Sequence, residues 1–174
     1  MNQFSAWPSG GQSNYIAELL TPSTTGPATL LSRPTLEWER RGNPVNEGPY
    51  GISRNGTDFV VYSASYCVTQ YYSLGLLTLK KGADPLRTDS WVKSPRPIFE
   101  SANGLFGTAH NAFFKSPDGT EDWNVYHANR SPSGVCDGGR QTFIQKMDWN
   151  ADGTPNLGRP VGAGVEIREP SGTK

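Results

Sequence analysis

The feature of this sequence that most constrains its fold is an internal repeat. The stretch EGPYGISRNGTDFVVYSAS (residues 47–65) is similar to HNAFFKSPDGTEDWNVYHAN (residues 110–129). Glu47 and His110 lie 63 positions apart, and after one extra residue Tyr62 and Tyr126 lie 64 apart. In both copies Asn-Gly or Asp-Gly separates two short runs, and these dipeptides favour the positive φ angles of a tight hairpin turn. The repeat therefore predicts two similar units, each of which begins with a β-hairpin.

Further strands are predicted after each hairpin. The segments YYSLGLLTLKKGADPLRTDSWVKSPRPIF (71–99) and QTFIQKMDWNADGTPNLGRPV (141–161) each supply a third strand, a turn region and a fourth strand. The earlier segment SNYIAELLTPSTTGPATLLSRP (13–34) looks like the second half of such a unit without its first hairpin. Radial repetition of four-stranded antiparallel sheets is typical of β-propellers, which close with at least about four blades. The sequence thus predicts an all-β fold, a single partial propeller of about two and a half blades over residues 1–174, with a tandem sandwich as the alternative.

Charge and hydropathy exclude two classes of partner. Sixteen Lys and Arg residues balance sixteen Asp and Glu residues, so the basic surface of a nucleic-acid binder is not expected. No apolar run reaches the ~18 residues of a membrane helix. The first residues, MNQFSAWPSGG, lack the basic and apolar regions of a secretion signal.

The chain has two cysteines, Cys67 and Cys136. Each follows the second predicted strand of its unit, so both are expected at the same end of the propeller. A disulfide there requires Cα atoms about 4.4–6.8 Å apart, and the sequence leaves the pairing open.

Six motifs follow one another in a specific order along the chain. They are YIAELL (15–20), PVNEGPY (44–50), FVVYSAS (59–65), YSLGLLT (72–78), HNAFFKSPDGTEDWNVYHAN (110–129) and MDWNADGTPNLGRPV (147–161). Together they resemble glycoside hydrolase family 43, five-bladed propeller enzymes that remove arabinofuranosyl or xylosyl units from plant cell-wall polysaccharides. The resemblance extends from about residue 7 to residue 161 and leaves residues 162–174 as a tail. It covers the C-terminal half, or slightly more, of the family's catalytic domain.

The motif PVNEGPY places a single carboxylate, Glu47, at the start of a predicted inner strand. Taken alone, Glu47 could be a solvated loop residue. Gly48 permits close approach of backbone or substrate and Pro49 fixes φ, so the carboxylate is expected to be held rigidly. In the family the glutamate of an Asn-Glu-Gly-Pro-like motif is the general acid, and the resemblance implies this role for Glu47. A carboxylic acid in suitable surroundings can protonate the oxygen of a leaving group.

Two further residues are candidates for substrate binding. His110 matches Glu47 in the next unit, and in the family a histidine here binds water beneath the substrate or belongs to a calcium-associated cluster. Arg140, in GRQTFIQ (139–145), matches a stretch that supplies a substrate-contacting arginine, whose fork suits sugar hydroxyls or a carboxylate. The alternatives are a structural histidine and an exposed loop arginine. His127, which matches Ser63 on the second strand, is expected to pack within its blade. The resemblance requires no cofactor and allows a calcium ion near the axis.

The family uses three carboxylates, of which this chain carries one. The resemblance places a general-base aspartate and a second aspartate, which tunes the acid, upstream of Met1. Inverting hydrolysis needs the base about 6.5–9.5 Å from the acid. The sequence therefore predicts an inverting hydrolase of arabinose- or xylose-containing polysaccharides, truncated and without its base. The alternatives are a non-catalytic carbohydrate-binding remnant and an interaction propeller without a sugar site. Polymeric substrates imply an extracellular location for the family.

A partial ring leaves its first and last units without neighbours. Apolar residues of the first unit are therefore expected to be partly uncovered, namely Ile16, Leu19, Leu30 and Leu31. Exposed apolar surface and unpaired strand edges favour self-association of the chain.

Overall fold

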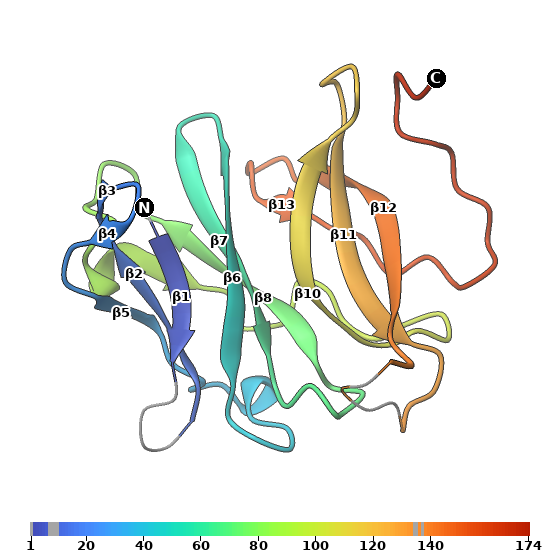
Figure 1. The fold of residues 1–174 in the computed structure, drawn as a ribbon, viewed down its shortest axis with the longest axis horizontal. Coiled ribbons are helices and arrows are strands. Elements are labelled where there is room, and N and C mark those ends of the chain that lie inside the picture. Colours follow the sequence, from blue (N-terminus) through green and yellow to red (C-terminus); the bar gives the residue numbers. More distant parts are fainter. Residues whose placement is uncertain (1, 7–10, 134–135, 137) are drawn as a thin grey trace.

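In the computed structural model, residues 2–6, 11–133, 136 and 138–174 are described (Figure 1). The strands form antiparallel sheets that follow one another along the chain. The first sheet has the order β1-β2-β5 and contains β1 (Asn2–Ala6), β2 (Ser13–Ala17) and β5 (Thr29–Ser32). A small separate hairpin, β3 (Leu19–Thr21) and β4 (Thr24–Thr25), connects β2 to β5.

Two four-stranded sheets follow, each with its strands in chain order. The second sheet contains β6 (Asn46–Arg54), β7 (Thr57–Ala64), β8 (Ser73–Leu79) and β9 (Trp91–Lys93). The third sheet contains β10 (Phe106–Lys115), β11 (Asp122–Asn129), β12 (Gln141–Trp149) and β13 (Pro155–Asn156). The helical turns in the described part are two 3₁₀ helices, η1 (Glu37–Glu39) and η2 (Thr88–Ser90). Neither has the length or apolar character to cross a membrane.

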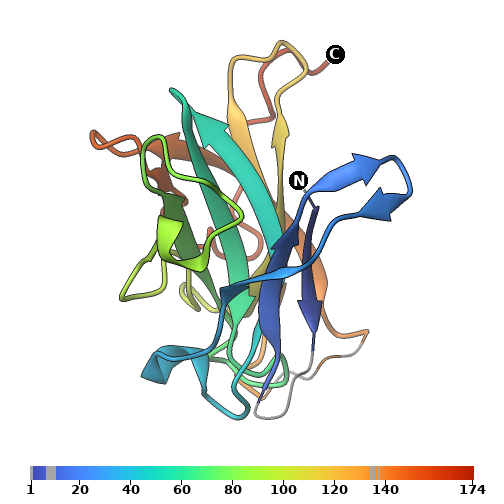
Figure 2. The same ribbon diagram turned by 90° about the vertical axis from the view of Figure 1, so that its left-hand side faces the viewer.

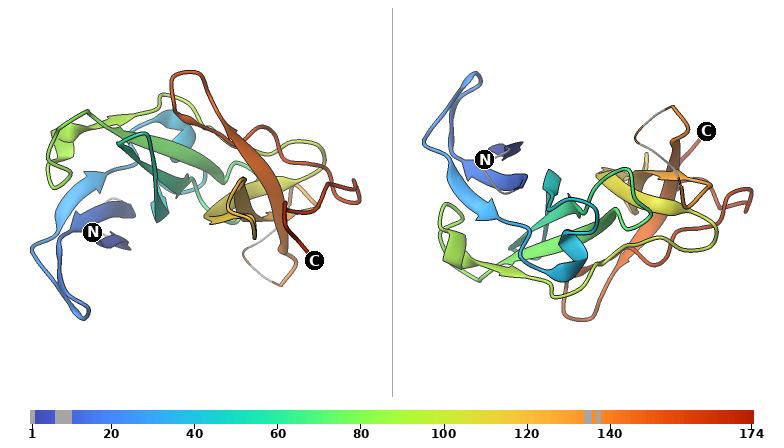
Figure 3. Two further views of the ribbon diagram at one scale, coloured as in Figure 1. Left: turned by 90° about the horizontal axis from the view of Figure 1, so that it is seen from above. Right: turned by 90° about the horizontal axis from the view of Figure 1, so that it is seen from below.

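The three sheets lie side by side as blades. β6 contacts both β1 and β10, the first strands of the neighbouring sheets. Viewed along the strands, the sheets follow a curve, and the first strand of each lies toward its inner side (Figure 3). Figure 2 shows the strands from the side, with the first sheet nearest the viewer. This arrangement is part of a β-propeller, and the predicted all-β, partial-propeller fold is confirmed.

The first blade contains a strand that the sequence did not predict. β1 pairs with β2 from Asn2 opposite Ala17 to Ala6 opposite Ser13. The interpretation of this blade as a unit without an inner hairpin was therefore wrong. A strand of five residues near the N-terminus, without an Asn-Gly or Asp-Gly turn after it, gives little signal in the sequence.

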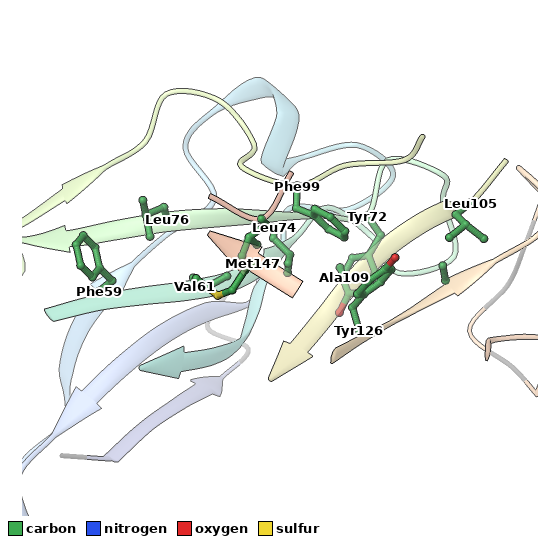
Figure 4. Close-up of a cluster of buried hydrophobic side chains, with 12 residues drawn as sticks. Phe59, Val61, Tyr72, Leu74, Leu76, Phe99, Leu105, Ala109, Tyr126 and Met147 are labelled. Carbon is green, nitrogen blue, oxygen red and sulfur yellow. The ribbon is translucent and has the colours of Figure 1, made fainter. Parts of the chain in front are cut away.

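The apolar core is divided between the two faces of the second sheet. Successive residues of a strand point to opposite faces, so Phe59 and Val61 of β7 pack toward the third sheet while Val60 and Tyr62 pack toward the first. Figure 4 shows the larger cluster, which consists of Phe59, Val61, Tyr72, Leu74, Leu76, Phe99, Leu105, Ala109, Tyr126, Ala128, Met147 and Leu157. This cluster joins the second and third blades and anchors Tyr72, which is important for the candidate site.

The first blade is covered better than expected. Ile16 and Leu31 are only 1% and 3% exposed because they pack against β7 and β8 in the smaller cluster. The prediction of partial exposure was wrong for these two residues. It is confirmed for Leu19, which is 44% exposed on the β3–β4 hairpin, and for the half-buried Leu30.

Residues 162–174 contain no strand and contact the third blade. The Ser171 N–H donates to the Glu121 carboxylate at 3.0 Å, and the Ser171 hydroxyl donates to Asp118. This segment thus reaches the β10–β11 hairpin at the upper right of Figure 1.

A fully buried carboxylate, Glu39, connects the first blade to the second. It follows the first sheet in η1 and is 0% exposed. Its two oxygens accept hydrogen bonds from Thr35 N and Leu36 N (2.8 Å each), Tyr62 Oη (2.8 Å), Asn46 Nδ2 (3.0 Å) and Lys93 Nζ (2.8 Å). Burial lowers the pKa of Lys93 while Glu39 opposes that shift. A buried charge is tolerated when it is paired and fully hydrogen-bonded, as it is here.

Removing the charge of Glu39 should destabilise the fold strongly. Glu39→Gln leaves Lys93 without its ionic partner in a site where the lysine side chain is 19% exposed, and breaking a buried pair costs about 3 kcal/mol or more. Glu37→Gln is the matched control because Glu37 forms an exposed pair with Arg41, with side chains 85% and 50% exposed. That change should cost less than about 1 kcal/mol. Urea unfolding monitored by tryptophan fluorescence measures both, and equal losses would contradict a structural role for the buried pair.

Candidate active site

The site is built around the start of β6. Asn46, the first residue of the strand, is fully buried and donates to Glu39 at 3.0 Å while it accepts from Ser32 Oγ at 2.7 Å. Its backbone N–H also donates to the carbonyl oxygen of Gln12 at 2.9 Å. These bonds fix the strand start, so the next residue, the half-buried Glu47, leaves from a rigid position.

A β-bulge follows Glu47 immediately. Glu47 pairs with Ser63 and Tyr50 pairs with Val61, so two residues of β6, Gly48 and Pro49, stand opposite Tyr62 alone. Gly48 has a φ of +53°, which glycine adopts without the steric cost of a Cβ. The bulge re-aims the strand beside the candidate acid.

The third blade contains the same bulge with a different residue. Ala109 pairs with His127 and Ala112 pairs with Val125, so His110 and Asn111 stand opposite Tyr126. His110 has a φ of +53°, the value found at Gly48. His110 therefore occupies the place of Gly48, and Ala109 occupies that of Glu47. The predicted match of His110 to Glu47 is corrected by one residue.

The two bulges face each other across the blade interface. A Cβ built on Gly48 would lie 3.4 Å from the His110 ring, so the glycine leaves room for the imidazole. The backbone N–H of His110 donates to Ser63 Oγ at 2.8 Å. A positive φ is uncommon for a residue other than glycine, and such conformations are concentrated at functional sites.

Tyr72 joins the candidate acid to the histidine. Its hydroxyl lies 2.7 Å from Glu47 Oε1 and 3.1 Å from His110 Nδ1. The residue is 1% exposed. Burial raises the pKa of Tyr72 well above its ordinary value, and the charge of Glu47 raises it further. The phenol thus keeps its proton and donates it in a hydrogen bond.

His127 and Arg140 complete the cluster. The His127 ring lies nearly parallel to the rings of Tyr72 and His110, at centroid distances of 5.7 and 5.9 Å. Burial lowers the pKa of His127 to about 4, with smaller contributions from Arg140 and His110, so His127 is neutral at neutral pH. Within the part of the chain that the structure describes, its two ring nitrogens and Arg140 Nε are buried without a hydrogen-bond partner.

A disulfide closes the loops beside this cluster. Cys67 and Cys136 are bonded, with Cα atoms 5.9 Å apart, so the two cysteines lie at the same end of the blades as predicted. The Cys67 carbonyl oxygen accepts a hydrogen bond from Arg140 Nη2 at 3.2 Å. The covalent link therefore holds the residue that orients Arg140.

The structure brings the three predicted residues into one cluster. Glu47 and His110 meet through Tyr72, and Arg140 lies close enough to lower the pKa of both Tyr72 and His127. Sequence reasoning did not single out Tyr72, and it assigned His127 to blade packing. The match of His127 to Ser63 in the sequence is confirmed by the register, because Ser63 pairs with Glu47 and His127 pairs with Ala109. This match was the available signal that His127 lies beside the start of an inner strand.

A metal site is not evident in the described residues, which contain no group of three or more His, Cys, Asp or Glu side chains suited to one ion. Calcium prefers six to eight oxygen ligands, whereas the described cluster offers one carboxylate beside two imidazoles. The calcium ion considered near His110 stays a prediction.

A carboxylate held at the inner rim of propeller blades, among a phenol, two imidazoles and a guanidinium, defines a site for proton transfer or for binding a polyhydroxylated ligand. The profile of the family described as "Glycosyl hydrolases family 43" matches residues 3–155. The chain belongs to this family.

Individual relatives support the assignment. The chain is 44% identical over 158 residues to an extracellular exo-α-(1→5)-L-arabinofuranosidase of Streptomyces avermitilis, in a match that covers 87% of this chain and 33% of that protein. It is 46% identical over 156 residues to α-L-arabinofuranosidase 43 of Humicola insolens, covering 84% and 32%. The crystal structure of an α-L-arabinofuranosidase from Lactobacillus brevis superposes with a TM-score of 0.88 and 37% identity, covering 94% of this chain and 53% of that one. The chain thus spans about a third of the curated relatives and about half of the solved enzyme.

Reduction of the disulfide should destabilise the fold. The bond closes a loop with a sequence separation of 69, and restricting the unfolded chain over such a length contributes about 2–4 kcal/mol. Denaturant unfolding with and without dithiothreitol measures this difference. The double variant Cys67→Ser/Cys136→Ser is the control, because its stability should match that of the reduced protein and should not respond to the reductant. An unchanged midpoint on reduction of the wild-type protein would show that the bond contributes nothing.

Proposed function

We propose that this chain supplies the general acid, Glu47, of an inverting glycoside hydrolase that acts on arabinofuranosyl units of plant cell-wall polysaccharides. The observation that carries the proposal is the placement of Glu47. It leaves a strand start fixed by buried hydrogen bonds, its carboxylate is held by Tyr72 at 2.7 Å, and it faces His110 of the next blade. Identity above 40% to two arabinofuranosidases favours arabinofuranosyl over xylosyl substrates.

The mechanism assigns a separate task to each residue. Protonated Glu47 gives its proton to the glycosidic oxygen as the bond to the anomeric carbon breaks, so that the leaving group departs as a neutral alcohol. Arg140 and His110 bind hydroxyl groups of the sugar, because guanidinium and imidazole nitrogens form directional hydrogen bonds. Water attacks the opposite face of the sugar after a second carboxylate, the general base, removes its proton.

We place that base outside this chain. Six of the seven described aspartates are engaged by the opposite strand of a hairpin, by turn residues or by cationic side chains: Asp58, Asp84, Asp89, Asp118, Asp122 and Asp152. The seventh, Asp148, is exposed on β12, away from the strand start that carries Glu47. The chain also spans only about a third of its curated relatives. Both observations support a base contributed by other blades of a complete ring.

An extracellular location fits the same proposal. Disulfides such as Cys67–Cys136 persist in oxidising compartments. The Streptomyces avermitilis relative is described as extracellular. Self-association through open blade edges stays a prediction, to which the exposed Leu19 and Leu20 of the β3–β4 hairpin are relevant.

A chimeric enzyme tests the role of Glu47. Residues 11–161 replace the matching segment of the Lactobacillus brevis enzyme, whose fold they share. The chimera should hydrolyse arabinofuranosides, and Glu47→Gln should lower kcat/KM by about 10²–10⁴-fold on an arabino-oligosaccharide, since removal of a general acid typically costs this much. The loss should be much smaller on 4-nitrophenyl arabinofuranoside, because nitrophenolate departs without protonation. Glu18→Gln, an exposed residue of the same segment, should leave both rates unchanged.

A folded chimera whose activity on both substrates is unaffected by Glu47→Gln would contradict the general-acid role. A chimera that binds arabino-oligosaccharide without hydrolysing it would favour the non-catalytic carbohydrate-binding alternative.

The isolated chain should show no measurable hydrolysis of aryl arabinofuranosides or xylosides, because the proposed base is not part of it. Colorimetric assays over several hours, with the Lactobacillus brevis enzyme as positive control, measure this. Turnover at ordinary enzyme rates that disappears in Glu47→Gln would mean that the chain contains its own base.

A further inference from the structure

We propose that Tyr72 is a positioning residue whose hydroxyl couples Glu47 to His110, because it donates its one hydrogen to the carboxylate and accepts a hydrogen from the imidazole. Its phenol donates to Glu47 Oε1 and thereby holds His110 in the tautomer with hydrogen on Nδ1. The catalytic meaning of this coupling rests on the proposed function, whereas the coupling itself is a property of the folded chain.

The first step of the argument is a count of hydrogens. A tyrosine hydroxyl has one hydrogen to donate and can accept with its lone pairs, whereas an ionised carboxylate can only accept. The short contact of 2.7 Å to Glu47 Oε1 therefore takes the phenol hydrogen. The contact of 3.1 Å to His110 Nδ1 must then be a bond that the phenol oxygen accepts. Since a neutral imidazole carries one N–H, that hydrogen lies on Nδ1 and Nε2 is the acceptor.

The surroundings keep the phenol in this role. Tyr72 is 1% exposed, and its pKa is raised well above the ordinary value by burial and by Glu47, so the hydroxyl does not ionise. Its ring stacks on His127 at 5.7 Å and cannot swing away. The Ser63 hydroxyl accepts the backbone N–H of His110 at 2.8 Å. Its own hydrogen can therefore point to the phenol oxygen, an interaction that opposes the rise in the pKa of Tyr72.

The coupling has a consequence for the carboxyl group. Oε1 accepts from Tyr72 whether Glu47 is ionised or protonated, provided that the transferable proton lies on Oε2. The phenol therefore distinguishes the two oxygens and leaves Oε2 as the one that gives its proton to the glycosidic oxygen. The hydrogen bonds of Tyr72 and His110 need not rearrange when that proton leaves, and a preorganised network of this kind lowers the cost of proton transfer. His110 meanwhile presents Nε2 as an acceptor for a sugar hydroxyl.

Nitrogen NMR of the isolated chain tests the coupling without any assay of activity. The chain has two histidines, so a sample with ¹⁵N-labelled histidine gives two ring systems, which His127→Gln assigns. At about pH 8.5 an ordinary histidine is neutral. We expect Nδ1 of His110 to carry the hydrogen in the wild-type protein, and both Tyr72→Phe and Glu47→Ala to move it to Nε2.

The Glu47→Ala variant is decisive. Among the described hydrogen bonds, Glu47 reaches His110 only through Tyr72. Without the carboxylate the phenol can turn its hydrogen to His110 Nδ1, a better acceptor than the Ser63 hydroxyl oxygen, and this forces the His110 hydrogen onto Nε2. A merely structural contact between Tyr72 and His110 would not respond to a change at Glu47. Tyr50→Phe is the matched control. Tyr50 lies on β6, the strand of Glu47, but its hydroxyl donates to the Phe113 carbonyl oxygen at 3.2 Å. It should leave the tautomer unchanged.

Two results would overturn the proposal: hydrogen on Nε2 of His110 in the wild-type protein, or hydrogen that stays on Nδ1 in Glu47→Ala. Should Tyr72→Phe fail to fold, the wild-type and Glu47→Ala spectra decide the question by themselves. Either negative result leaves the kinetic test of Glu47 in the chimera standing. Conversely, loss of the general-acid role in that test leaves the tautomer result intact.

Discussion

The buried carboxylate of Glu39 is the interaction on which the arrangement of the blades and the site depends. It follows the first sheet in sequence, yet its partners Asn46, Tyr62 and Lys93 belong to three strands of the second. Moving an ion pair out of water is costly, and the cost is offset only when the remaining hydrogen bonds are made. Here they are made, and the geometry that satisfies them also fixes Asn46. Because Glu47 is the next residue, this buried cluster fixes the backbone position from which the candidate acid projects.

The second constraint is a bulge that occurs at the same place in two neighbouring blades. One blade fills the position of positive φ with Gly48 and the other fills it with His110. Had both been glycine, the interface would hold no imidazole, and had both carried side chains, the two would compete for the space into which His110 fits. The pair is thus complementary. Tyr72, which directly precedes β8, occupies the remaining space and converts the close approach of two inner strands into a chain of hydrogen bonds.

Much of the fold could be predicted from local signals. The Asn-Gly and Asp-Gly turns marked the hairpins β6–β7 and β10–β11, and the third strands predicted in the segments that follow them are β8 and β12. The register was harder. The second strands are offset by 64 residues, as Tyr62 and Tyr126 indicated, but the first strands are offset by 62, as Gly48 and His110 show. The hairpin loops differ in length. The intermediate offset of 63 matched identical residues in the two copies, and it therefore aligned His110 with Glu47 instead of Gly48. Tyr72 was missed for a different reason: its role depends on contacts with residues 25 and 38 positions away, which no local pattern encodes.

The distribution of unsatisfied polar atoms bears on whether the cluster is a site or only a packed interface. A buried donor or acceptor without a partner costs about 1–3 kcal/mol, so native structures contain few of them and each needs an explanation. Among such atoms in the described part, both ring nitrogens of His127 and Nε of Arg140 belong to this one cluster, whereas others, such as Trp38 Nε1, lie elsewhere. A blade interface selected for stability alone would be expected to place apolar side chains there, as the neighbouring cluster around Phe99 and Tyr126 does. Keeping imidazole and guanidinium nitrogens beside Glu47 at this energetic cost is better explained by a role in the site than by packing alone.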